Sequence, residues 1–487
     1  MSDKIPNILV IPIDNRPVCY DLHLQAAEIF SGLKVFTPNI SLLGDLNKDA
    51  NIEEIRKWTK KTVKDNNIDI AVLALDTIAY GGLIPSRRSP LNFDEIRENV
   101  EEFFKILKSK NKKLKIYAVS SIMRISNNNI NEEEKSYWDK YGRAIFRYSY
   151  LAHKLLRNYD VELEAEMIKL AQGIPFEVID DYLNTRKRNF DINSYYIDLA
   201  KAGKIDKLVF SQDDTSEFGF NIEEKELLWK QAVKEIITPK ITIKTGADEM
   251  VLSLMSRALC DYFKETPKIT PVFFADRAKD IVSRYEDVTI ENSTKASVEL
   301  CGGKVAQNGD IKLLINAPND SQDEICLGIF EDIKSNIQAE KLLEYIVQYN
   351  GKYAIADVKF ANGADNYLVE KLLEQNYDTE KFYGYGAWNT TGNTLGTVVA
   401  TAIIKELAKK YGAYNEQAFL KTQYIRLLDD WAYQSNVRKI LRSKGDMKPV
   451  NEEMKPFEKN VSKWLDYTVE TFYSFPWERT FEVKIEL

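Results

Sequence analysis

The sequence predicts an α/β protein made of two doubly wound parallel-sheet domains that face a cleft, with a helical insertion in the first domain. Short apolar segments of strand length recur along the chain, and most are separated by segments with the apolar spacing of helices. This alternation is typical of parallel sheets covered by helices. A chain of 487 residues is also too long for one ordinary core. The same spacing fits a (β/α)8 barrel with extra α/β units, which remains the alternative.

Ten strands are expected, five before residue 220 and five after residue 239. The first, at 7–13, is a continuous apolar run, as expected for a strand that is covered on both faces. The other nine are expected at 33–36, 69–75, 115–120, 208–210, 240–244, 270–274, 311–315, 353–356 and 383–385. The helices between them include 51–66, 93–108, 250–263, 339–349, 366–375 and 394–410.

These elements divide the chain into three parts. We expect an N-terminal α/β domain at 1–239 with a helical insertion at about 130–203, and a second α/β domain at 240–415. The remaining residues, 416–487, form a C-terminal appendage with a helical stretch near 424–439 and a closing strand at 481–487. In the helix at 394–410, the small residues Gly396, Ala400 and Ala402 predict close packing against a sheet.

Composition excludes several classes of function. The net charge is −7 with acids and bases interleaved, and no basic patch with spaced aromatic residues is present, so we expect no nucleic-acid partner. No run reaches the ~18 apolar residues of a membrane span, and the N-terminus has no signal-peptide pattern, so we expect a cytoplasmic protein. Four scattered cysteines without a CxxC motif fit a reducing compartment. The oligomeric state stays open.

Histidine is almost absent, which limits the chemistry further. Only His23 and His153 occur, so a histidine-rich metal site is excluded and a histidine-dependent catalytic triad is disfavoured. Carboxylates, arginines, amides and tyrosines must therefore carry most of any catalysis.

Polar side chains follow most of the expected strands, and ligands of parallel α/β proteins bind at the C-terminal ends of strands. Two adjacent carboxylates repel each other, so one of them tends to keep its proton, which suits acid/base catalysis. Helix capping explains any single one of these residues equally well. We expect the catalytic residues to be Asp213, Asp214, Asp248 and Glu249. The expected substrate-binding residues are Asp14, Arg16, Asp76, Tyr80, Arg87, Arg124, Asn316, Asp357, Asn362, Asp365, Trp388, Asn389 and Asn393.

Several segments of the sequence resemble a bacterial family catalogued as domain of unknown function 4127. These segments include IDNRPVCYD at 13–21, LALDTIAYGGLIPSR at 73–87, SQDDTSEFG at 211–219 and GAWNTTGNTLG at 386–396. SSIMR at 120–124, YLNTRKRN at 182–189, GADE at 246–249 and ADVKFANGAD at 356–365 complete the set. Together they cover roughly residues 7 to 410. The resemblance implies a bacterial α/β protein and brings no settled activity with it.

Three functions fit the residues. The first is a hydrolase that uses paired carboxylates, without a cofactor, on a glycosidic bond of a small carbohydrate or amino-sugar derivative. Trp388 beside Asn389 and Asn393 would offer such a sugar-like substrate an aromatic face and amides. The second is a hydrolase or transferase that uses Mg²⁺, Mn²⁺ or Ca²⁺ and acts on a phosphate or carboxylate substrate, because hard cations prefer oxygen ligands. The third is a non-catalytic protein that binds a small molecule.

Overall fold

Two open sheets organise the chain, and each belongs to its own compact unit. The computed structural model describes residues 4–327, 336–376 and 378–487. The six-stranded unit comprises Asn7–Asn15 and Val35–Ala247. The five-stranded unit comprises Arg16–Lys34 and Asp248–Leu487, together with residues 4–6. Both sheets end in edge strands, so the α/β prediction with parallel sheets is confirmed and the described residues form no closed barrel.

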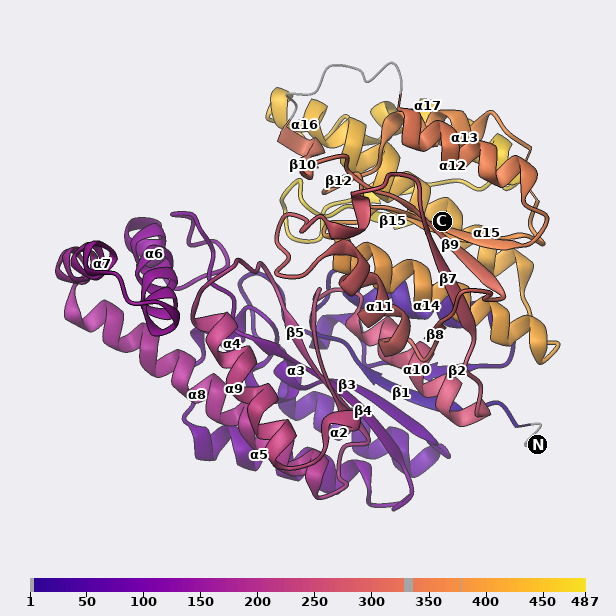
Figure 1. The fold of residues 1–487 in the computed structure, drawn as a ribbon. Coiled ribbons are helices and arrows are strands. Elements are labelled where there is room, and N and C mark those ends of the chain that lie inside the picture. The colour runs from indigo at the N-terminus through magenta and orange to yellow at the C-terminus, as the bar shows by residue number, and fades with distance from the viewer. Residues whose placement is uncertain (1–3, 328–335, 377) are drawn as a thin grey trace. The chain divides into compact units, whose positions relative to one another are not determined.

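The six-stranded sheet has the order β2-β1-β3-β4-β5-β6 (Figure 1). Its strands are β1 (Asn7–Ile11), β2 (Lys34–Phe36), β3 (Ile70–Ala74), β4 (Lys115–Ile122), β5 (Lys207–Gln212) and β6 (Ile241–Thr245). Every residue of β3 and β5 is buried, and β3 (IAVLA) is accordingly a continuous apolar run, whereas β5 (KLVFSQ) is apolar only in its centre. The direction of the strand order reverses at β1, so the topological switch point lies between β1 and β3.

Helices that connect consecutive strands cover one face of this sheet. They are α2 (Ile52–Asp65), α5 (Phe93–Leu107), α8 (Phe176–Lys201) and α9 (Phe220–Lys234), and they lie side by side (Figure 1). Side-chain caps fix where two of them begin. Asn51 accepts a hydrogen bond from the Glu54 N–H, and Asn92 and Glu95 form a capping box at α5. The short helices α3 (Leu75–Tyr80) and α4 (Pro85–Arg88) follow β3 directly.

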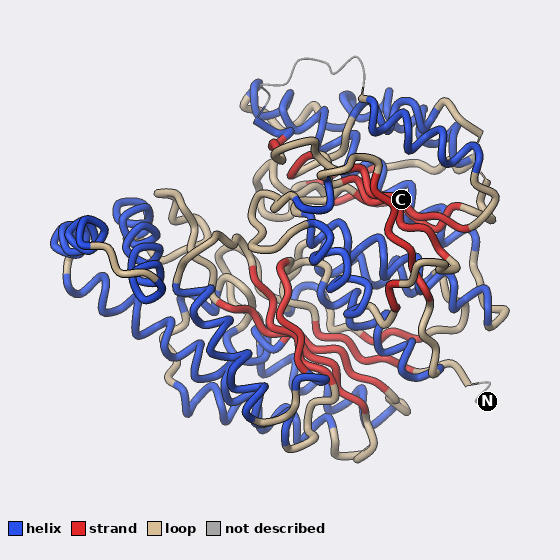
Figure 2. Tube along the Cα trace, viewed as in Figure 1, coloured by secondary structure: helices blue, strands red, loops and turns tan. Residues whose placement is uncertain are grey.

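A helical arm extends from this unit between β4 and β5. It consists of α6 (Trp138–Arg157), α7 (Val161–Gly173) and the N-terminal half of α8, and Figure 2 shows it as helices and loops without strands. Trp138, Ile145 and Ile174 form its small core with Tyr182 and the β4 exit residue Met123. The arm corresponds to the helical insertion that the sequence predicts.

The five-stranded sheet has the order β13-β11-β9-β7-β8, and all its strand pairs are parallel. Its strands are β7 (Lys268–Phe273), β8 (Lys304–Val305), β9 (Ile311–Asn316), β11 (Lys352–Asp357) and β13 (Phe382–Gly386). Helices α10 (Met250–Phe263), α11 (Ile290–Leu300) and α14 (Thr391–Lys410) pack together on one face. Helices α12 (Ile337–Gln348) and α13 (Asn366–Leu373) cover the other face, so this sheet is doubly wound (Figure 1).

The C-terminal residues pack onto the same unit. They form α15 (Glu416–Arg426), a π-helix (Leu427–Val437), α16 (Arg438–Lys444) and α17 (Val450–Leu465). Helix α15 contacts β13, and α17 contacts α13. The closing strand predicted at 481–487 is the shorter β15 (Lys484–Glu486), which pairs antiparallel with β14 (Phe472–Ser474).

The boundary between the two units differs from the predicted one. The sequence starts the second domain at residue 240, but β6 pairs with β5 and completes the six-stranded sheet. Helix α1 (Pro17–Glu28) follows β1 and yet belongs to the five-stranded unit. An apolar run shows that a strand exists but not which strand it pairs with, so spacing alone does not locate this boundary.

Helix α14 approaches α10 closely at Gly396. A Cβ atom at this position would lie 2.3 Å from Cγ of Glu249, the residue that precedes α10. The small residue predicted to allow close packing against a sheet therefore makes room for Glu249 and for Ser253 of α10.

Gly396→Ala should destabilise the protein by about 1–3 kcal/mol, because the methyl group displaces Glu249 in a packed core. The midpoint of urea unfolding measures the effect. Gly173→Ala, at the end of α7, is the matched control, since its Cβ would meet nothing within 4 Å. Equal stability of the two variants would contradict this account of the packing.

Candidate functional site

Arg124 gathers four carboxylates at the C-terminal edge of the six-stranded sheet. It lies two residues beyond β4, and its side chain is 15% exposed. Its Nε contacts Glu134 at 2.9 Å and its Nη2 contacts Glu133 at 2.8 Å. Its Nη1 contacts Asp213 at 3.2 Å and Asp214 at 3.4 Å. Burial alone lowers the pKa of Arg124, but the four carboxylates together raise it, so the guanidinium stays charged.

Arg87 binds three of the same carboxylates from the neighbouring strand exit. It lies in α4, and its side chain is buried. Its Nη2 contacts Asp213 at 3.3 Å, and its Nη1 contacts Glu133 at 3.4 Å and Glu134 at 3.5 Å. We call Arg87, Arg124, Glu133, Glu134, Asp213 and Asp214 the arginine–carboxylate cluster. It unites four residues that the sequence places in the site and adds two that it does not.

Glu133 and Glu134 belong to the arginine–carboxylate cluster but were not predicted from the sequence. They lie in the loop between β4 and α6, where no strand ends. Glu134 is buried, and it also accepts a hydrogen bond from the Ser126 hydroxyl. The acidic run at 132–134 is the only feature of the sequence that could have indicated them. Acidic residues are also common in the solvated first turn of a helix, so the run did not point to a site.

Asp214 has the properties of an acid. Burial raises its pKa to about 7, and the charge of Asp213 adds to the increase. Its side chain is nevertheless 33% exposed, so it remains within reach of a ligand. Its backbone is left-handed, with φ of 47°, a conformation that is uncommon for residues other than glycine.

Asp76 lies deeper, beside the topological switch point. It is buried in the first turn of α3 and accepts a hydrogen bond from the Ser121 N–H at 2.9 Å. Burial raises its pKa to about 7, although the Ser121 hydrogen bonds oppose the shift. Asp14 follows β1 across the switch point and is also buried. Tyr80 is buried at the end of α3, with the Arg188 guanidinium over its ring.

A polar pocket opens next to the arginine–carboxylate cluster and shares Glu134 with it. Its volume is about 540 Å³. Arg88, Lys135 and Tyr137 supply hydrogen-bond donors at its wall, and Asp181 accepts bonds from the latter two at 2.6 and 2.8 Å. Asn47, Asn131, Glu132 and Ser136 complete the lining. Such a wall suits a polar ligand that offers several hydroxyl, amide or carboxylate groups.

The five-stranded unit has a separate buried network at the ends of β9 and β11. The Asn316 amide donates to Asp357 at 2.9 Å and to Asp365 at 3.2 Å, and the Asp365 N–H donates to Asp357. Burial raises the pKa of Asp357 to about 7, and Asp365 adds to the increase. Asp365 is also the N-cap of α13. All three predicted residues come together here, but none of them is exposed.

Arg16, Asp248 and Trp388 form a second buried group in this unit. Arg16 pairs with Asp248 at 2.8 Å, and the Trp388 indole N–H donates to the same carboxylate at 3.3 Å. Trp388 is only 3% exposed and packs edge-on against Phe481, so its ring is not an open platform for a sugar. Glu249 precedes α10 and is buried against Gly396.

Three predicted asparagines hold loops in place. The Asn362 amide donates to Glu324 at 2.9 Å, and its backbone N–H donates to the Asn389 carbonyl. Asn393 accepts a hydrogen bond from the Asp248 N–H at 3.3 Å. Asn362 and Asn389 both have left-handed backbones, which asparagine tolerates better than most residues.

A second adjacent pair of aspartates was missed in the π-helix. Asp429 and Asp430 are buried and contact Arg426 at 3.1 and 3.0 Å. Burial raises the pKa of Asp430 to about 7. Asp430 also accepts a hydrogen bond from the Ala387 N–H directly after β13. The sequence hides this pair because it lies within a helical pattern and not at a strand end.

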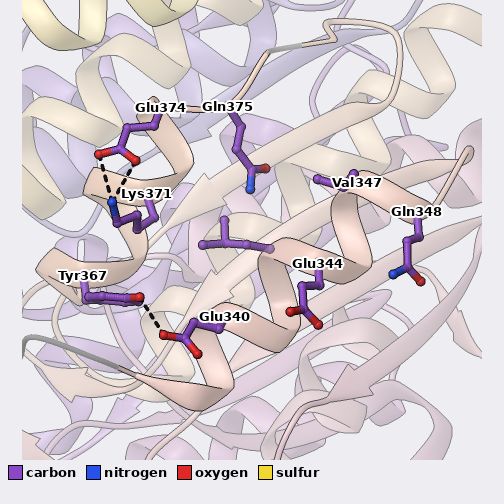
Figure 3. A pocket seen from close by; sticks show the side chains of 9 residues that line it. Glu340, Glu344, Val347, Gln348, Tyr367, Lys371, Glu374 and Gln375 are labelled. Carbon is purple, nitrogen blue, oxygen red and sulfur yellow. Dashed lines mark hydrogen bonds and ion pairs between the residues drawn. The ribbon is translucent and has the colours of Figure 1, made fainter.

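A groove of about 500 Å³ runs between α12 and α13. Figure 3 shows that Glu340, Glu344 and Val347 face it from α12, with Tyr367 and Lys371 on α13. Its lining includes none of the predicted site residues, so the groove does not belong to the candidate site.

The residues present do not fit a divalent cation. Within residues 4–327, 336–376 and 378–487, no group of three or more His, Cys, Asp or Glu side chains is arranged to hold a metal ion. Asp213, Asp214 and Asp248 contact arginines, which already neutralise part of their charge.

In the same described part of the chain, no helix has the length and apolar character needed to cross a membrane.

The Asp76→Asn variant should lose less stability against unfolding than the wild type as the pH rises. The unfolded carboxyl releases its proton near pH 4 and the folded one near pH 7, so the contribution of Asp76 to stability falls as the pH rises between these values. Asparagine resembles the protonated form and keeps an acceptor for the Ser121 N–H. The stability of the variant relative to the wild type should therefore increase across this interval, by at most ~1.4 kcal/mol per pH unit.

Urea unfolding at several pH values from 4.5 to 8 would measure this change in stability, because the range covers most of the interval between the unfolded and folded pKa values and extends past the folded value of about 7. Asp320→Asn is the control, because Asp320 is an exposed aspartate. If the difference in unfolding free energy between Asp76→Asn and the wild type stayed constant over this pH range, Asp76 would be ionised in the folded protein at every pH tested.

Comparison with known proteins identifies one protein family that covers nearly the whole chain. No curated protein matches the chain. The family described as protein of unknown function (DUF4127) matches residues 8–486, which is nearly the full length of both units. The chain therefore belongs to the DUF4127 family.

Proposed function

We propose that the protein is a hydrolase that cleaves a glycosidic bond of a small carbohydrate or amino-sugar derivative by acid catalysis from Asp214. One observation carries the proposal: two adjacent carboxyls share an arginine, and the more exposed of the two, Asp214, has a pKa raised to about 7. A carboxyl that keeps its proton at neutral pH, next to one that is ionised, is the arrangement that glycosidases use.

The charge balance of the arginine–carboxylate cluster supports this division of roles. With Asp214 protonated, three carboxylates (Glu133, Glu134 and Asp213) face two guanidiniums (Arg87 and Arg124), which leaves a net charge of −1. This residual negative charge opposes ionisation of Asp214. It also favours the positive charge that develops on the sugar ring in the transition state.

Each residue then has a defined task. Asp214 donates its proton to the oxygen of the leaving group as the glycosidic bond breaks, and a water molecule then adds to the sugar cation and returns a proton to Asp214. Asp213, which accepts hydrogen bonds from both arginines, stabilises the developing cation. The adjacent polar pocket binds the hydroxyl or amide groups of the substrate through polar side chains of its wall, such as Asn47, Asn131 and Lys135. No cofactor takes part in these steps.

We propose in addition where the protein acts and what it binds. The scattered cysteines without a CxxC motif support a reducing compartment, and we propose the cytoplasm. The partner is a sugar-like small molecule.

Asp214→Asn should lower kcat by a factor of about 10² to 10⁴, because asparagine has no proton to donate. The fold should persist, since asparagine tolerates the left-handed backbone at this position. The loss should be large for aryl glycosides with a poor leaving group and small for dinitrophenyl glycosides, whose leaving group needs no protonation. Rates on the two substrate classes measure this.

Glu217→Gln is the matched control, because it makes the same carboxyl-to-amide change in the same loop on an exposed residue. Activity of Asp214→Asn equal to that of Glu217→Gln on the poor leaving group would refute the acid role of Asp214.

The pH profile gives an independent check. The acid must be protonated, so kcat/KM of the wild type should fall as the pH rises through about 7, the pKa of Asp214. The residual activity of Asp214→Asn should lack this alkaline decline. A wild-type profile that stays flat from pH 6 to pH 9, an interval that brackets the ~7 transition, would exclude Asp214 as the group that titrates.

A further inference from the structure

Exposed apolar side chains gather on the helical arm. Leu156, Tyr159, Val161, Ile168 and Phe176 all lie within one short stretch of the chain, and each is at least 50% exposed. None of the residues of α7, which lies at the centre of this stretch, is buried. Monomeric proteins rarely leave such a concentration of apolar surface uncovered, so it indicates an interaction surface.

The exposed face of α7 has the spacing of a helix–helix seam. Val161, Ala165, Ile168 and Gln172 are exposed and follow each other at intervals of four, three and four residues. This is the spacing of the a and d positions of a coiled coil. Glu162 and Lys169, both exposed, each follow a d position and therefore lie on the same flank of the seam, seven residues apart.

This pattern is complementary to itself when two copies run antiparallel. In an antiparallel pair the flanking positions of one helix face the equivalent positions of the other, so Glu162 meets the partner subunit's Lys169, and the reverse contact follows by symmetry. Ala165 meets the partner subunit's Ile168. Tyr159 and Phe176 lie in the sequence just before and just after α7. These rings are 67% and 77% exposed in the single chain.

We propose that α7 is a dimerisation surface whose occupant is α7 of a second copy of this chain, bound antiparallel about a twofold axis. The flank carries one acid and one base, which suits a second copy better than an anionic membrane, because membrane-surface helices carry a basic face. A helix of 13 residues is only ~20 Å long and offers less than the ~800 Å² per partner of a standard interface, so the dimer dissociates readily.

Sedimentation velocity of the full-length protein from low to high micromolar concentration tests the proposal. The wild type should show a reversible monomer–dimer equilibrium. Ile168→Asp should raise the dissociation constant at least about tenfold, because it puts a charge in the seam. Ile236→Asp is the matched control, since Ile236 is an isoleucine of the same unit that is 87% exposed outside the arm, and it should dimerise like the wild type.

Charge exchange tests the antiparallel arrangement. Glu162→Lys or Lys169→Glu alone should weaken the dimer, and the double variant should restore it, because it re-forms both pairs with opposite polarity. A monomeric wild type at every concentration would overturn the proposal, including the case in which that monomer binds lipid vesicles. A dimer that survives Ile168→Asp, or a double variant no tighter than the single ones, would overturn it too.

Discussion

The contact of Arg124 with four carboxylates is the constraint on which the candidate site depends. It joins the end of β4 to the end of β5 and to the loop that leads into the arm. Without a cation, four buried or half-buried carboxyl groups in this volume could not all ionise, because like charges about 4 Å apart repel by several kcal/mol in a protein environment. Arg87 supplies the second positive charge from the β3 exit. The two guanidiniums leave the cluster slightly negative, and this charge adds to the effect of burial, which is the main cause of the raised pKa of Asp214.

Among the described residues, three pairs of aspartates contain a member whose pKa is raised to about 7, and a comparison of the three separates catalytic from structural candidates. Asp357 and Asp430 are fully buried, and their oxygens accept hydrogen bonds from backbone N–H groups. Both carboxyls therefore brace loops of the five-stranded unit. Asp214 alone combines the raised pKa with a side chain that is one-third exposed. Perturbed pKa values occur at structural networks as well as at active sites, so accessibility decides between these pairs.

The sequence predicted the strands well because their signal is local. All ten expected strands occur within a few residues of their expected positions, since buried parallel strands are rich in apolar residues, whereas the two-residue edge strand β8 (Lys304–Val305) was not predicted. Strand pairing is not local, which explains why β6 was assigned to the wrong domain. The site was predicted in part for the same reason. Asp213 and Asp214 lie at a strand exit, where polar residues stand out, whereas Glu134 reaches the cluster from a loop and Asp430 from a helix interior.

The left-handed backbone at Asp214 explains how two consecutive residues come to share one arginine. Successive side chains of a strand point to opposite faces of the sheet, so an extended continuation of β5 would separate the two carboxyls. The turn at Asp214, with φ of 47°, interrupts this alternation, and both side chains contact Nη1 of Arg124. Such a backbone costs free energy for any residue with a Cβ atom, and glycine would relieve that cost. A carboxyl group held at this position in spite of the cost is consistent with a residue retained for its chemistry, because the turn itself would form more easily without it.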